Sequence, residues 1–173
     1  GGVLNTARAY MYTMAGTQTA GIIYGGYSTT PAGNTEEYNG TSWTEESDLN
    51  TNRFSLSGIS AGTQTATIGF GGSSPPSFSS TTATESYDGS TWTTVNSLNT
   101  ARAQAAGTGT QASGLAVGGE PNVAATERWD GTSWTTNPGT LNDGRGAMGG
   151  SGTQTSSLVF GGTPDLTSTE TWD

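Results

Sequence analysis

Large apolar side chains in this chain stand in short alternating runs separated by glycine, serine and threonine. Alternation with a period of two is typical of β-strands, and the abundant Gly, Ser and Thr disfavour helix. Each run ends in a Gly-Gly pair, which favours a turn. The pattern therefore predicts an all-β chain. The four clearest runs are Ile22/Tyr24, Ile68/Phe70, Leu115/Val117 and Leu158/Phe160.

These runs belong to a fourfold repeat. Each unit carries, in order, Leu-Asn-x-x-Arg, Gly-Thr-Gln, Gly-Gly and Glu-x-aromatic, and in the first three units a tryptophan follows that aromatic by five residues. The repeats cover approximately 4-48, 49-97, 98-140 and 141-173. The repeat markers are Arg8, Arg53, Arg102, Arg145, Glu36, Glu85, Glu127, Glu170, Trp43, Trp92 and Trp134.

One unit predicts four short antiparallel strands. Asn-Gly at 39-40 and Asp-Gly at 88-89 and 130-131 favour tight hairpin turns before the tryptophan strand. A repeat of 40 to 50 residues built from such strands predicts a β-propeller. Small residues suit the crowded innermost strands, and examples are those at 105-107 together with Ala147, Gly149 and Gly150. We expect four blades, the last incomplete because the sequence stops at Asp173 without a fourth tryptophan strand.

The order of arginine, Gly-Gly, Glu-x-aromatic and tryptophan resembles the kelch motif, in four copies over nearly the whole chain. The resemblance implies a propeller with Gly-Gly at the end of the second strand and the later tryptophan on the fourth. Kelch propellers usually have more than four blades, so we expect the ring to be completed by a longer chain or by other chains. The Thr- and Gly-rich composition of the repeats also resembles tandem repeats in tail fibre or decoration proteins of tailed bacteriophages.

Composition narrows the function classes. The chain has 14 acidic and 5 basic residues, a net charge of -9 and no histidine or cysteine. Triads that need His or Cys, and metal sites with nitrogen or sulfur ligands, are therefore excluded. An acidic chain does not suit nucleic acid, and no apolar run reaches the roughly 20 residues that insert into a membrane. We expect no catalytic residues, cofactor or metal, and a place outside the cell or on a virion.

The four motif arginines allow two interpretations. They could ring a channel mouth and bind an anion, or each could tie its own blade to the glutamate of the third strand. Because arginine and glutamate recur together in every unit, we favour the structural role. The acidic pairs Glu36-Glu37 and Glu45-Glu46 are expected at a solvated edge, because adjacent strand residues point to opposite faces.

The loops after Gly-Gly differ in every repeat and are the candidate binding segments. A constant scaffold with divergent loops on one face is common in binding modules, although drift in unconstrained loops would look the same. The candidate residues are Tyr27, Pro75, Pro76, Phe78, Glu120, Asn122 and Asp165.

These observations predict a non-catalytic binding or structural module on a virion or extracellular surface, acting in host attachment or decoration. Expected partners are a protein or a cell-surface glycan, with other copies of the chain or other virion proteins as further candidates. Two alternatives stay open. One is the propeller domain of a secreted glycan-active enzyme whose catalytic residues lie outside this chain. The other is an intracellular kelch adaptor that recruits a protein.

Overall fold

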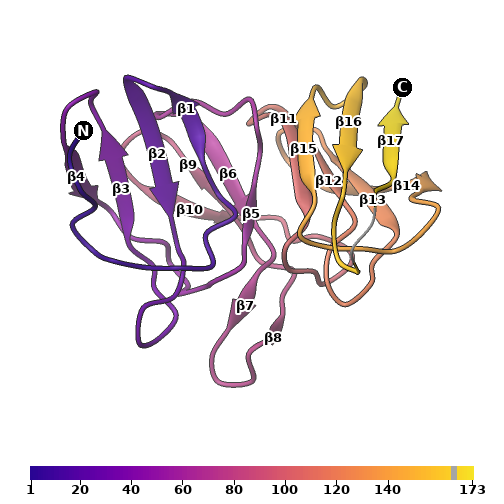
Figure 1. The fold of residues 1–173 in the computed structure, drawn as a ribbon, viewed down its shortest axis with the longest axis horizontal. Coiled ribbons are helices and arrows are strands. Elements are labelled where there is room, and N and C mark those ends of the chain that lie inside the picture. The colour runs from indigo at the N-terminus through magenta and orange to yellow at the C-terminus, as the bar shows by residue number, and fades with distance from the viewer. Residues whose placement is uncertain (165–166) are drawn as a thin grey trace.

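The computed structural model describes residues 1–164 and 167–173 and confirms an all-β propeller (Figure 1). Its described residues form three four-stranded antiparallel sheets, one three-stranded sheet and a two-stranded ribbon. The four larger sheets are the blades, and successive blades follow one another around an axis. Within the described residues, there is no helix that is long and apolar enough to cross a membrane.

Each blade runs from an inner strand at the axis to an outer strand at the rim. Blade one contains β1 (Ala15–Thr17), β2 (Ala20–Tyr24), β3 (Thr35–Tyr38) and β4 (Trp43–Glu46). Blade two contains β5 (Ser57–Gly58), β6 (Thr67–Phe70), β9 (Thr84–Tyr87) and β10 (Trp92–Val95). Blade three contains β11 (Ala106–Thr110), β12 (Ser113–Val117), β13 (Ala125–Trp129) and β14 (Trp134–Thr140). Blade four contains β15 (Gly149–Gly152), β16 (Ser157–Phe160) and β17 (Thr169–Trp172).

Two local features differ from the sequence interpretation. The Gly-Thr-Gln motif favours a turn after the inner strand, but in blades one and three Gly16-Thr17 and Gly109-Thr110 still belong to that strand, so the turn begins later. The loop after Gly-Gly in blade two is a small ribbon in which β7 (Ser73–Ser74) pairs with β8 (Ser79–Ser80). That ribbon projects from the end of the propeller where the other loops after Gly-Gly lie (Figure 1).

Three hydrophobic clusters hold neighbouring blades together. Between blades one and two, Ile22 and Tyr24 on the second strand meet Tyr87 and Trp92 of the next blade. The Tyr24 and Trp92 rings lie 4.6 Å apart in an edge-to-face arrangement. The same arrangement recurs between blades two and three. Between blades three and four, Val159 and the partly buried Trp172 complete the cluster. The three clusters join four blades into an arc.

Small residues line part of the axis, as expected. A hollow of about 430 Å³ lies between the inner strands, with Gly58, Gly107 and Gly150 among its lining residues. Larger residues also line the hollow, and they are Met11, Tyr12, Met14 and Ile23 from blade one and Met148 from blade four. The lining of the hollow is mostly apolar, and it includes the hydroxyl-bearing residues Tyr12, Thr13 and Ser60.

A buried ion pair ties each blade to the segment that enters it. The arginine guanidinium contacts the glutamate of the third strand in every blade, which confirms the structural interpretation of the repeat markers. In blade two, Arg53 is fully buried and donates to Glu85 Oε1 at 2.8 Å, and also to the carbonyls of Gly71 and Ala83. The other pairs are Arg8–Glu36 at 2.9 Å, and Arg102–Glu127 and Arg145–Glu170, both at 2.5 Å.

The motif asparagine completes this arrangement. Asn50 donates both its backbone N–H and its side-chain amide to Glu85 Oε2, at 2.6 and 2.9 Å, while Oε1 accepts from the arginine. Both carboxylate oxygens are therefore satisfied, as a buried charge requires. Burial lowers the pKa of Arg53, and the carboxylate of Glu85 opposes that shift. The solvated-edge prediction for the acidic pairs is wrong for Glu36, which is fully buried by the same contacts.

Removing one member of a pair should destabilise the fold strongly. We expect Arg102→Met to lower the free energy of unfolding by about 3–5 kcal/mol, because Glu127 is left buried without its countercharge. Denaturant unfolding measures the loss. The control is Arg128→Met, since Arg128 lies outside the motif and stacks on Trp172 at 5.6 Å. The double variant Arg102→Met/Glu127→Met should recover part of the loss. Equal losses for Arg102→Met and Arg128→Met would contradict this account.

The hairpin turns predict an acid dependence. The Asp88 carboxylate accepts backbone N–H groups of Ser90 and Thr91 at 2.9 and 2.8 Å, and these bonds lower its pKa. Asp130 makes equivalent bonds, which likewise lower its pKa. A lowered folded-state pKa contributes stability above the unfolded value of about 3.9, and this contribution is lost as pH falls through the folded value.

Asparagine should keep the turns and remove this acid sensitivity. Asn39 in blade one already accepts the same two N–H bonds through Oδ1, both at 3.0 Å. We therefore expect Asp88→Asn/Asp130→Asn to lose less thermal stability than the parent between pH 5 and pH 2, roughly the range in which carboxylates titrate. Thermal unfolding monitored by circular dichroism at each pH tests this. The charge-matched control changes the exposed Asp48 and Asp143 to Asn, and an identical gain there would refute the turn mechanism.

Candidate binding face

The loops at one end of the propeller share a fixed backbone base. In each blade, the residue after the motif arginine bridges to the residue after Gly-Gly. In blade one the Ala9 and Tyr27 backbones exchange two hydrogen bonds of 2.8 Å. The other bridges are Phe54–Ser73, Ala103–Glu120 and Gly146–Thr163. Because backbone groups make these bridges, the side chains at both positions are free to vary between blades.

The next residue along the chain, two places after each motif arginine, is a second variable position. The residue two places after each motif arginine has a positive φ, between 52° and 55°, although none of the four is glycine. Such a conformation costs roughly 1 kcal/mol or more and persists where the surroundings impose it. These residues are Tyr10, Ser55, Gln104 and Ala147. Backbone geometry is thus constant at this position too, while the side chain ranges from methyl to phenol.

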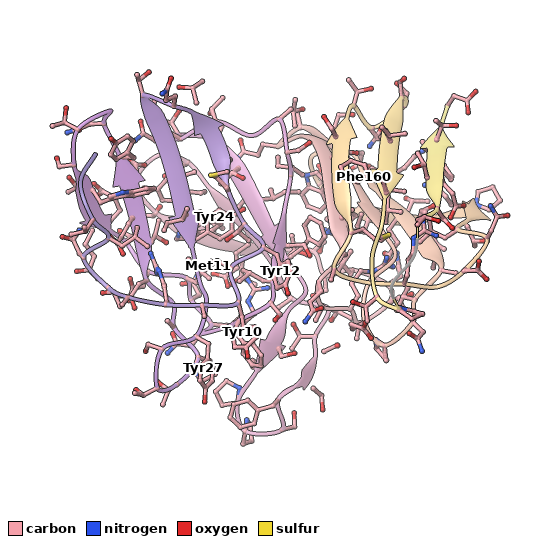
Figure 2. All side chains as sticks on the ribbon, in the orientation of Figure 1. Tyr10, Met11, Tyr12, Tyr24, Tyr27 and Phe160 are labelled. Atoms are coloured by element: carbon pink, nitrogen blue, oxygen red, sulfur yellow. The ribbon has the colours of Figure 1, made fainter. Side chains whose placement is uncertain are left out.

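Aromatic residues from these variable positions gather over blades one and two. The Tyr27 ring lies 5.4 Å from Phe54 and 6.3 Å from Tyr10, and both contacts are edge-to-face. Phe54 also contacts Phe78 at 6.3 Å, at the tip of the β7–β8 ribbon. Figure 2 shows Tyr10 and Tyr27 pointing to the same region beside that ribbon. We call Tyr10, Tyr27, Phe54 and Phe78 the aromatic cluster.

The aromatic cluster is open to solvent on its outer members. Tyr10 is 57% exposed and Phe78 is 51% exposed, whereas Tyr27 and Phe54 are half-buried between them. Exposed large apolar groups in a contiguous patch are characteristic of interaction sites. At the position equivalent to Phe54, blade three carries Ala103 and blade four carries Gly146. The cluster therefore belongs to one side of the propeller.

The structure brings together some of the predicted loop residues and separates others. Tyr27 and Phe78 both join the aromatic cluster, through Phe54. Pro75 and Pro76 are exposed at the tip of the same ribbon, next to Phe78 in sequence. Glu120 and Asn122 lie in the blade-three loop, which Ser80 Oγ reaches through a 3.2 Å hydrogen bond to the Glu120 carbonyl. Asp165 lies outside the described residues.

Sequence reasoning missed two members of the cluster. Tyr10 and Phe54 stand close to the motif arginines, outside the loops after Gly-Gly that were the candidate binding segments. A signal was present, because the second residue after the arginine differs in every repeat, and the first is alanine in two repeats, phenylalanine in one and glycine in one, while the arginine itself is constant. Variation beside a constant arginine indicates a candidate binding position, as it does in the loops after Gly-Gly.

Groups with a raised pKa lie away from this face. Burial raises the pKa of Tyr24 to about 12, in the interface between blades one and two. Burial also raises the pKa of Glu37, which accepts a 3.1 Å hydrogen bond from the Tyr87 hydroxyl at the same interface. Among the described residues, no group of three or more acidic side chains is placed to hold a metal ion. The cluster therefore offers ring faces, ring edges and tyrosine hydroxyls as its binding chemistry.

Comparison with known proteins adds no family to this picture. No protein-family model matches the chain, and a search of curated proteins finds no match. The β-propeller assignment accordingly stands on the observed sheets and their arrangement.

Proposed function

We propose that this chain is a non-catalytic binding and structural module of a virion or extracellular surface, which contacts a glycan or a protein through its variable loops. The aromatic cluster is the observation that carries the proposal. It places two exposed rings on two half-buried ones at the loop end of a rigid scaffold. Rings held by neighbouring rings lose little conformational freedom on binding, which favours affinity.

The net charge of the chain narrows the class of ligand that its surface suits. With a net charge of -9, the surface repels polyanions and suits a neutral or basic ligand. A neutral sugar presents C–H groups to a ring face and hydroxyls to the tyrosine hydroxyls. Apolar side chains of a protein surface would use the same rings. The kelch-like order of motifs and the phage-like composition of the repeats support a role on a virion or extracellular surface.

The proposal assigns no bond chemistry to the chain, and the use of its acidic residues supports this. The third-strand glutamates pair with arginines in all four blades, and the first three are almost fully buried. A carboxylate held by an arginine and two amide donors is a poor general base, because its lone pairs are occupied.

Phe78→Ala should weaken ligand binding about tenfold, which corresponds to the roughly 1.4 kcal/mol that a stacked ring provides. Binding of the labelled chain to an array of neutral glycans, and to intact bacterial cells, measures the effect. The matched control is Tyr12→Ala, because Tyr12 is 41% exposed but lies at the axial hollow. Both variants should unfold near the parent temperature. Undiminished binding by a Tyr10→Ala/Phe78→Ala double variant would refute the site.

A further inference from the structure

Three kinds of polar contact join neighbouring blades, the first two at all three described boundaries and the third at two of them. The first is the motif glutamine, which reaches back to the preceding blade. Gln64 Nε2 donates to the carbonyls of Tyr38 and Gly21 at 3.0 and 3.3 Å. Equivalent bonds join Gln111 to Tyr87 and Thr67, and Gln154 to Trp129 and Gly114. This role explains why the glutamine occupies the turn after the inner strand.

The second contact is a backbone bond between the residues of positive φ. Ser55 N–H donates to the Tyr10 carbonyl at 2.9 Å, Gln104 N–H to Ser55 at 2.8 Å, and Ala147 N–H to Gln104 at 2.8 Å. One such bond crosses each boundary. The series runs from blade one to blade four, and its ends are the Tyr10 N–H and the Ala147 carbonyl.

The third contact joins a tryptophan to a threonine. Trp92 Nε1 donates to Thr35 Oγ1 of the preceding blade at 2.9 Å, and Trp134 Nε1 donates to Thr84 Oγ1 at 3.1 Å. At both of these boundaries, the threonine is the first residue of the third strand. The indole therefore fixes the register of one blade against the next while its ring fills the hydrophobic cluster.

The two outer faces of the arc carry the separate halves of this interface. On blade one, Gln18 is exposed, Trp43 is half-buried, and both line a hollow of about 410 Å³ with Tyr38. On blade four, Leu158 is 39% exposed and Phe160 is 48% exposed, although their counterparts Ile22 and Tyr24 are fully buried. Figure 2 shows Phe160 on the blade opposite blade one.

We propose that blade four of one copy packs against blade one of a second copy, head to tail. The contact would repeat the internal boundaries. Trp43 Nε1 would donate to Thr169 Oγ1, the first residue of β17, and Gln18 would donate to the carbonyls of Ser157 and Trp172. Tyr10 N–H would donate to the Ala147 carbonyl. A second copy is the occupant because this chain carries both halves, and its three internal boundaries show that such halves fit.

One position makes this boundary different from the internal ones. Gly58, Gly107 and Gly150 lie against the preceding blade, where an added Cβ would meet Tyr24 Oη at 2.3 Å, the Gly58 carbonyl at 2.1 Å and Ala106 Cβ at 3.0 Å. The residue at the matching place before β1 is Met14, which is 74% exposed. The boundary between copies must therefore be wider at the axis than an internal boundary, and weaker.

A head-to-tail contact between identical chains closes into a ring or grows as an open series. Sedimentation velocity and light scattering over a wide range of concentration distinguish these outcomes from a monomer of 17.5 kDa. We expect a mass that rises with concentration. A ring reaches a plateau at a whole multiple of the chain mass, and an open series keeps growing. A monomer at all concentrations would overturn the proposal.

Paired variants test the two faces separately. Phe160→Asp should abolish association through blade four, and Trp43→Ala should abolish it through blade one. A mixture of the two should form a one-to-one dimer, because each copy supplies the face that the other has lost. Dimers formed by either variant alone would indicate a face that pairs with itself and would refute the head-to-tail contact. Thermal unfolding confirms that each variant folds.

Two further variants keep the test independent of folding defects. Met14→Gly restores the residue found at the internal boundaries and should strengthen association, so the mass should rise at lower concentration. No gain, or a loss, would contradict the assigned register. Phe78→Ala changes an exposed ring on the loop face and should leave the mass unchanged. Because that variant impairs the proposed ligand site, failure of self-association and failure of ligand binding are separable.

Discussion

The buried arginine–glutamate pair is the interaction on which the rest of the structure depends. A chain with 28 glycines and only 30% hydrophobic residues cannot hold its strands by apolar burial alone. The pair fastens the entering segment to the third strand, and Arg53 also holds the Gly71 carbonyl where the second strand ends. The entering segment, the end of the second strand and the third strand are thereby fixed by one charged centre. Separating the pair would leave a buried charge without its partner, which is costly, so the pair holds the segment and the strand in one geometry.

Among the described residues, the hydrogen bonds and apolar clusters between blades join neighbouring blades. Each boundary repeats a glutamine, a backbone bond and an apolar cluster, so the stability of the arc is close to a sum of blade and boundary terms. This arrangement separates scaffold from surface. The backbone bridges at the loop bases do not involve side chains, which leaves Tyr10, Tyr27 and Phe54 free to form the aromatic cluster on one side only.

The fold was accessible from sequence because the markers are local and repeated. Period-two runs, Gly-Gly and Asp-Gly give the strands and turns, and recurring arginine and glutamate give their pairing. The candidate site was accessible only in part. Tyr27 and Phe78 were expected from loop divergence, but the contribution of Phe54 depends on a backbone bridge to Ser73 that no local pattern reveals. The β7–β8 ribbon and the role of Asn50 depend on tertiary contacts in the same way.

Near-identity of the repeats has a consequence for how the chain reaches its structure. The segments at 4–8 and 98–102 are both Leu-Asn-Thr-Ala-Arg, so each matches the glutamate site of the other's blade. Closing the longer loop from Arg8 to Glu127, rather than to Glu36, costs only about 1 kcal/mol more in chain entropy. The entropy of loop closure therefore favours pairing of Arg8 with Glu36 of its own blade only weakly over pairing with Glu127 of blade three. Folding from the N-terminus during synthesis removes the ambiguity, because blade one captures its own arginine before blade three is made. Refolding of the complete chain lacks that order and is exposed to register exchange between blades.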